Sequence, residues 1–436
     1  MQIASSHNRS HPDSYTFSIQ QFQKNRTFSY PFRKCCFSKD IVYNVAIDLF
    51  MCGVATLLQV WTTRFTGVGL PVVLGCTFTA VGPMIAIGSS SGITAIYGAL
   101  IASGIIVILI SGFVGKLARF FPPVVLGSVV TVIGLSLIPV AINDIGGGAP
   151  GEPGFASMQN LALGGLTIGL IIVLNRVGTV FTRAAAVLFA VLIGTGVAAT
   201  LGLVDFSPVR EASWFQMVQP FYFGMPTFNV SAILVMTLVA IISMIESTGV
   251  FFALSDITKK PIGSNELTKG YRAEGVATIL GGIFNSFPYT TFSQNVGLVQ
   301  LSGVKSRRVI FWTSGLLILL GFLPKVATFT TLIPKPVLGG AMLVMFGTVA
   351  ASGIRILSEV DFSKNENLVT IALSIGIGLG ITANPGIVAN MPEPIQLFTD
   401  SAIVAGSFTA LFLNGFFRLV DRFRPVEVVA EERQVS

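Results

Sequence analysis

Charged residues are scarce in this chain. Lys, Arg, Asp and Glu together make up 11% of the 436 residues, hydrophobic residues make up 52%, and the mean hydropathy is +0.78. A soluble protein of this length would carry about twice that charged fraction. Apolar stretches also recur at membrane-spanning length. The composition therefore excludes an ordinary soluble domain and indicates a polytopic membrane protein.

Histidine is almost absent, and cysteine is rare. The two histidines, His7 and His11, lie in the polar N-terminal stretch, so proton chemistry inside the spans has to use carboxylates. The four cysteines are Cys35, Cys36, Cys52 and Cys76. Their spacing suggests neither a disulfide framework nor a zinc site. We expect no metal, no cofactor and no catalytic residues, because a nucleophile paired with a base is also missing.

Thirteen apolar segments, several of them short, are candidate spans. They are residues 41–61, 69–87, 93–113, 124–143, 160–175, 184–203, 231–254, 271–286, 292–303, 309–323, 337–354, 367–383 and 402–417. Lys and Arg gather in alternate connections, whereas the connections 144–158 and 384–401 have neither. The basic connections and the C-terminus are therefore expected in the cytoplasm, in a multi-pass protein of the plasma membrane. The same rule explains the net charge of +7 without a nucleic-acid partner.

The N-terminal stretch breaks this alternation. Counted back from the C-terminus, span 41–61 must run from outside to inside, yet residues 1–40 are basic and should stay in the cytoplasm. The contradiction occurs at this place alone, as if one span were missing before residue 41. We therefore expect an atypical polar tail (1–40), an incomplete first repeat (41–203), a second, inverted repeat (231–420) and a cytoplasmic tail (421–436).

Short matches between the two halves support this division. Residues 121–127 (FPPVVLG) resemble 333–339 (IPKPVLG), and residues 53–58 (GVATLL) resemble 275–280 (GVATIL). The matches keep their order along the chain. Two halves with odd numbers of spans make an inverted-repeat transporter. The second half holds seven candidate spans and the first holds six, so the counterpart of span 231–254 should lie near residues 15–40.

Two spans in matching places are broken. Residues 72–83 (VVLGCTFTAVGP) and 287–297 (FPYTTFSQNVG) contain β-branched residues, Gly and Pro. Each predicts a short extended piece followed by a half-helix that starts after Pro83 or near Asn295. Non-helical backbone at membrane depth is tolerated where it is buried or lines a wet cavity. Paired interruptions therefore predict a binding site at the bilayer midplane.

Glu246 lies inside the apolar segment 231–254, and a polar cluster that includes Gln294 and Asn295 follows at the second broken span. An ionisable group at membrane depth costs at least ~2.5–3.5 kcal/mol on insertion scales. A chain that keeps such a group beside two amides is expected to bind something polar there.

These segments resemble the nucleobase–cation symporter family, in its xanthine/uracil permease branch. The motif that carries the resemblance is 294–307 (QNVGLVQLSGVKSR), supported by 246–249 (ESTG), 272–275 (RAEG), 282–288 (GIFNSFP) and 75–80 (GCTFTA). The likeness covers roughly residues 41–420. A Gln before the Asn is typical of purine carriers, so the bacterial xanthine permeases look most similar. The resemblance departs at the first helix, which residues 1–40 do not match, and at Val250, where some members have a polar residue.

The resemblance implies a fold and a site. The fold is an all-α inverted repeat of seven plus seven spans, with a core and a gate domain, and the protein is usually a homodimer. Glu246 matches the carboxylate that binds the substrate, Gln294 and Asn295 match the amide pair that binds the base, and Phe78 matches the aromatic residue that stacks on it. Glu274, together with Glu246, is expected to couple transport to protons. The implied substrate is a purine, xanthine or urate.

Each of these residues also has a simpler interpretation. Glu246 could bond a neighbouring helix, Glu274 could form an ion pair with the adjacent basic cluster, Asn295 could cap a half-helix, and Phe78 could fill the core. Two other functions stay open as well. One is an anion transporter or channel of the sulfate-carrier type, and the other is a chain that no longer transports because its first helix is missing.

Overall fold

A computed structural model describes residues 35–117, 122–151, 154–292, 295–296, 299, 303–388, 391 and 401–423. The longer helices are α2 (Cys35–Val60), α3 (Val81–Ser91), α4 (Ile93–Leu117), α5 (Pro123–Ile145), α6 (Met158–Val177), α8 (Ala186–Thr200), α10 (Val230–Thr258), α11 (Ser264–Ile283), α13 (Arg307–Gly321), α15 (Lys335–Leu357), α16 (Asn365–Ala383) and α18 (Ala402–Phe423). The short helices are η1 (Phe78–Ala80), α7 (Val180–Ala184), α9 (Ser207–Glu211), α14 (Pro324–Thr331) and η3 (Pro385–Val388). Two strands, β1 (Leu74–Cys76) and β2 (Tyr289–Thr291), complete the described elements.

The described helices are those of a membrane protein. Eight of them are long and apolar enough to cross a bilayer, and α13 with α14, bent by 86° at their junction, would make a ninth. Pro324 begins α14, where it cannot continue the hydrogen bonding of α13. Large apolar side chains such as Leu109, Phe113 and Trp312 lie exposed on the outside of the bundle, as lipid-facing residues do.

Most expected spans coincide with helices to within a few residues, with one marked difference of boundary and one unexpected bend. Helix α11 begins at Ser264 instead of residue 271, because the carboxylate of Glu266 accepts the N–H of Gly263 and caps a polar first turn. The sharp bend before α14 was not expected. The span predicted at 292–303 and the predicted counterpart of α10 near 15–40 lie largely outside the described residues.

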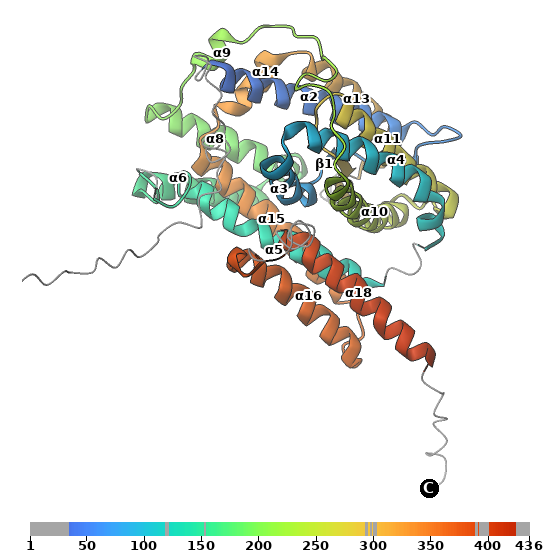
Figure 1. Cartoon of the computed structure of the whole chain (residues 1–436). Coiled ribbons are helices and arrows are strands. Elements are labelled where there is room, and N and C mark those ends of the chain that lie inside the picture. Colours follow the sequence, from blue (N-terminus) through green and yellow to red (C-terminus); the bar gives the residue numbers. More distant parts are fainter. Residues whose placement is uncertain are drawn as a thin grey trace, which may run out of the picture.

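The helices pack in two groups (Figure 1). One group contains α2, α4, α10, α11 and α13, and the other contains α5, α6, α15, α16 and α18. The strands belong to the first group, since β1 contacts α2 and β2 contacts α10 and α11. The order of elements supports the repeat, because α5 and α6 follow β1 as α15 and α16 follow β2. The fold class predicted from the sequence is confirmed, while the domain boundaries at 41–203 and 231–420 stay predictions.

Helices α5 and α15 form the tightest contact in the second group, and glycines make it possible. A side chain on Gly134 of α5 would overlap the backbone nitrogen of Ala350, and one on Gly353 of α15 would overlap that of Thr131. Small residues let helix backbones approach closely where lipid removes any hydrophobic drive between helices. Backbone contact at both positions therefore fixes how these two repeat-related helices cross.

This contact gives a prediction. Gly353→Val should force α5 and α15 apart and destabilise the purified protein by about 1–3 kcal/mol, the usual cost of overpacking. The measurement is the thermal unfolding midpoint in detergent. Gly347→Val on the same helix is the matched control, since its side chain would meet no atom within 4 Å. An equal loss of stability in both variants would contradict the role given to Gly353.

Candidate functional site

The two broken spans meet as a short antiparallel ladder. Its three residue pairs join β1 to β2 in the register Leu74↔Thr291, Gly75↔Thr290 and Cys76↔Tyr289. One more backbone bond continues it at each end, from Thr77 N–H to the Pro288 carbonyl (3.0 Å) and from Phe292 N–H to the Val73 carbonyl (3.1 Å). The predicted extended pieces are therefore present, and they pair with each other across the two repeats.

Helix starts beyond the ladder differ in one place from the prediction. Helix α3 begins at Val81, directly after η1, and not after Pro83. Pro83 lies in the first turn, where the N–H that it lacks would have no helical partner. Asn295 is helical, in agreement with a half-helix that starts near it.

Glu274 is the centre of a buried hydrogen-bond cluster. Its Oε1 accepts from the Ser247 hydroxyl of α10 (2.5 Å) and from the Thr291 hydroxyl of β2 (2.8 Å). Its Oε2 is buried and has no hydrogen-bond partner among the described residues. No Lys or Arg of the described residues pairs with Glu274, as the alternative interpretation required, and Arg272 instead donates to Ser111 and lies over the Phe65 ring. Glu274 thus links α11 to α10 and to the second strand.

Glu246 lies on α10 one turn after Ser243, which contacts the first broken span. Residues three or four apart share a helix face. Ser243, three residues before Glu246, therefore shares its face and hydrogen-bonds to Thr79 of η1 (3.3 Å), whereas Ser247, the next residue along the helix, hydrogen-bonds to Thr290 of β2 (3.1 Å). No side chain of the described residues hydrogen-bonds to the Glu246 carboxylate. It interacts electrostatically with Glu274, so the two predicted carboxylates are brought into one site.

Asn295 joins the second break to the first. Its side-chain Nδ2 donates to the backbone carbonyl of Pro71 (2.8 Å), and its N–H bonds to the Phe292 carbonyl (3.1 Å). Gln294 and the side chain of Phe78 lie outside the described residues, although the backbone of Phe78 begins η1, beside the Glu246 face of α10.

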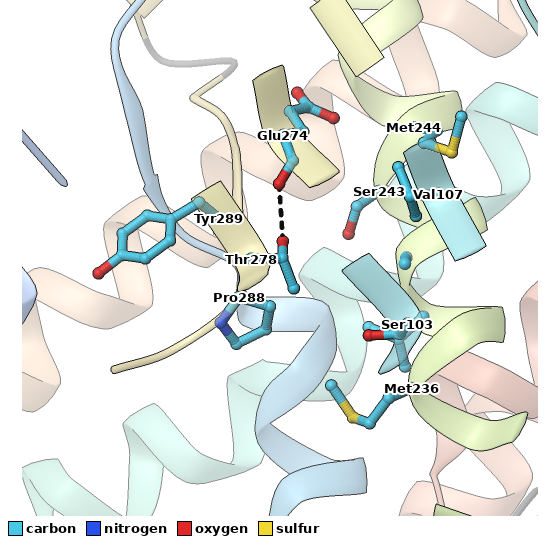
Figure 2. Close-up of a pocket in the computed structure, with 11 residues that line it drawn as sticks. Ser103, Val107, Met236, Ser243, Met244, Glu274, Thr278, Pro288 and Tyr289 are labelled. Atoms are coloured by element: carbon cyan, nitrogen blue, oxygen red, sulfur yellow. Dashed lines mark hydrogen bonds between the residues drawn. The ribbon is translucent and has the colours of Figure 1, made fainter. Parts of the chain in front are cut away.

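A small cavity lies beside Glu274, between α4, α10 and α11 (Figure 2). Ser103, Ser243 and Thr278 contribute hydroxyls to its wall, next to aliphatic and methionine side chains. The Thr278 hydroxyl donates to the backbone carbonyl of Glu274 at 2.9 Å. The space admits about one water molecule, far less than a planar heterocycle needs. In this structure the cavity therefore extends the carboxylate cluster by a space for water and is too small to be the purine-binding pocket.

Sequence reasoning missed several polar residues that build the site. Asp48 of α2 hydrogen-bonds to Ser286, just before β2. Asp48 lies in an apolar span, so the rule that selected Glu246 could have selected it too. Ser247 and Thr291, the partners of Glu274, carry no such signal, because hydroxyls are common in membrane helices and usually bond their own backbone.

The membrane-spanning helices, the two paired chain breaks and the buried carboxylates define a polytopic membrane transporter. A family model named Xan_ur_permease and described as "Permease family" matches residues 36–387. The chain belongs to this family of nucleobase permeases.

Curated relatives are similar along almost the whole chain. The chain is 54% identical over 393 residues to the "Xanthine permease" of Bacillus subtilis (strain 168), covering 90% of each protein. It is 55% identical over 380 residues to the "Nucleobase transporter PlUacP" of Paenibacillus larvae, covering 87% of each. It is 54% identical over 378 residues to the "Uric acid permease PucK" of Bacillus subtilis, covering 87% of this chain and 88% of the relative.

Solved structures share the fold at low sequence identity. The transmembrane domain of the cyanobacterial bicarbonate transporter BicA has a TM-score of 0.56 at 14% identity, covering 87% of this chain and 93% of that one. Murine Solute Carrier 26 family member A9 in its inward-facing state has the same TM-score at 12% identity, covering 96% of this chain and 77% of that one. The architecture is thus that of known membrane transporters.

The ladder gives a second prediction. A methyl group on Gly75 would overlap the ring of Phe292, which lies across β1 and leads into the Asn295 turn. Gly75→Ala should therefore lower the thermal unfolding midpoint in detergent, and adding Phe292→Leu should recover part of the loss, because Leu lacks the outer ring atoms. Gly112→Ala, which meets no atom within 4 Å, is the control. A double variant less stable than Gly75→Ala would refute this packing.

Proposed function

We propose that this permease is a secondary active transporter that takes up a purine, xanthine or urate, together with protons across the plasma membrane. The observation that carries the proposal is the convergence of Glu246 and Glu274 on two paired chain breaks. The names of the relatives, a xanthine permease and a uric acid permease, supply the substrate class. The chain thus combines a polar midplane site with the family in which purines are the cargo.

The chemistry of the base suits the site. Xanthine carries imide N–H donors beside carbonyl acceptors. The Glu246 carboxylate has no protein donor among the described residues, so its oxygens are free to accept ring N–H groups. Gln294 and the side-chain oxygen of Asn295 complete the recognition of the polar edge, and Phe78 stacks on the ring. A site built from such groups rejects bases that lack the matching edge, because its own buried polar atoms would be left unpaired.

Glu274 is suited to the coupling step. Its surroundings are hydroxyls and aliphatic side chains, and no Lys or Arg of the described residues is among the groups that act on it. A buried carboxylate without a cation favours its protonated form over its charged form. Protonation would change its bonds to Ser247 and Thr291, and through them the position of β2. We therefore assign proton coupling to Glu274, with Glu246 as its partner.

The orientation and assembly proposed from the sequence remain part of this proposal. The basic connections and the C-terminus are placed in the cytoplasm by the positive-inside rule. A homodimer through the gate helices follows from the resemblance. Lipid, substrate and protons are the partners, with no nucleic acid and no enzyme activity.

Two alternatives have different outcomes in transport assays. The anion transporters share the fold, but at their low sequence identity this likeness shows the architecture alone. Two carboxylates at the site also disfavour the binding of an anion. A chain that no longer transports would leave uptake at background. Uptake of labelled xanthine and urate by cells without their own carriers, with sulfate and bicarbonate as competitors, separates these cases. Competition by the inorganic anions alone would favour the first alternative.

Glu246 yields the third prediction. Glu246→Gln should reduce xanthine uptake about tenfold to a hundredfold at low substrate concentration, because a hydrogen bond to a charged acceptor is replaced by one to a neutral amide. Initial uptake rates, normalised to carrier abundance, measure the effect. Glu359→Gln changes an exposed carboxylate beyond α15 and should behave as wild type. Unchanged uptake by Glu246→Gln would remove Glu246 from the binding site.

Glu274 yields the fourth prediction, which concerns proton coupling. Glu274→Gln should abolish accumulation driven by an imposed pH gradient in proteoliposomes, because Gln cannot exchange a proton, while exchange of internal for external xanthine continues. Glu266→Gln on the same helix is the matched control. This residue caps the first turn of α11, and the side-chain oxygen of Gln can still accept the N–H of Gly263. If Glu274→Gln still accumulates xanthine when a proton gradient is applied, the coupling role belongs elsewhere.

A further inference from the structure

A third carboxylate within a membrane-spanning helix, Asp48, lies at the opposite end of the ladder from Glu274. It is on α2, within the apolar window Tyr43–Val60. The Ser286 hydroxyl donates to its Oδ1, and the backbone N–H of Phe287 is also among the groups that act on the carboxylate. Asp48 is not among the residues expected to touch the purine, and its contacts are with the segment that enters β2.

These contacts reach both strands. Tyr289 of β2 shares a hydrogen bond with Ser286, and its hydroxyl lies 3.5 Å from the backbone oxygen of Asp48. The thiol of Cys76 of β1, the register partner of Tyr289, is also among the groups that act on the carboxylate. Asp48 therefore holds the Cys76–Tyr289 end of the ladder, as Glu274 holds the end at Thr291.

The segment before β2 depends on such an anchor. Asn285 has a positive φ of 60°, and of the irregular residues that follow it, Ser286 donates its N–H to the Gly281 carbonyl of α11 (2.8 Å). Ser286 and Tyr289 are each 2% exposed, so a lost partner could not be replaced by bulk water. No Lys or Arg of the described residues is among the groups that act on Asp48, which leaves hydroxyl, thiol and N–H donors to fix it.

We propose that Asp48 is a positioning residue for substrate binding, which sets the place of β2 and of the Asn295 turn by holding Ser286 and Tyr289. The inference rests on the proposed purine transport, since its effect on function is on the affinity for that substrate. Asp48 itself does not contact the base. Its removal should therefore weaken substrate affinity through the strand, without stopping the transport cycle.

The test is a kinetic comparison of full-length carriers in membranes. Asp48→Ala should raise the KM for xanthine about tenfold, as expected for a lost hydrogen bond to a charged group, with the maximal rate per carrier unchanged. Asp48→Asn keeps a side-chain oxygen to accept from Ser286 and should restore most of the affinity. Ser286→Ala should resemble Asp48→Ala, and the double variant should be no worse, because both remove the same contact.

A second measurement does not need transport. Amide hydrogen exchange over residues 285–292 should be faster in purified Asp48→Ala than in wild type and in Asp48→Asn. Asp256→Ala, an exposed carboxylate on α10, is the control for both assays. Unchanged KM and exchange in Asp48→Ala, or an Asn variant as impaired as the Ala variant, would overturn the proposal. If wild type itself takes up no purine, the proposed function fails. The amide hydrogen exchange measurement then tests by itself whether Asp48 positions β2.

Discussion

The structure depends on a ladder that is too short to hold itself together. Two strands of three residues pair at membrane depth, and an isolated pair of this size is not stable in water, still less where unpaired backbone groups meet lipid. Side chains complete the bonding. Thr56 accepts from the N–H of Leu74 (3.0 Å), and Asn295 donates to the carbonyl of Pro71 (2.8 Å). The helices of the first group are thus arranged to supply polar side chains to the break.

Two carboxylates, on different helices, hold the two ends of this ladder, and a third, on α10, interacts electrostatically with one of them. Asp48 of α2 and Glu274 of α11 are both engaged by hydroxyls. Glu246 of α10 has no such donor among the described residues. In the proposed function this difference assigns the roles, because a carboxylate already satisfied by the protein is suited to position or exchange a proton, whereas one without a donor among the described residues is suited to accept from a ligand. The proposal thus uses the bonding pattern, more than the residue type, to distinguish binding from support.

The sequence predicted the parts of this arrangement that leave a local signal. Chain breaks at residues 72–83 and 287–297 are visible as Pro, Gly and β-branched residues in apolar spans, and Glu246 is visible as a charge among them. The pairing of the ladder was not predicted, nor was Asp48, since its bond to Ser286 joins residues 238 positions apart. The start of α3 was wrong by a few residues, because Pro is as acceptable in a first turn as before it.

Helix α10 is where the site meets the rest of the molecule. Its Ser243–Ser247 face bonds to the two breaks, while Ile242 packs into the cluster formed by α5, α15 and α18. That second group is held by backbone contact between α5 and α15, so it resists internal rearrangement. The first group is likewise tied internally by the ladder and its carboxylates. Helix α10, which carries Glu246, therefore joins the polar face of the first group to the apolar core of the second.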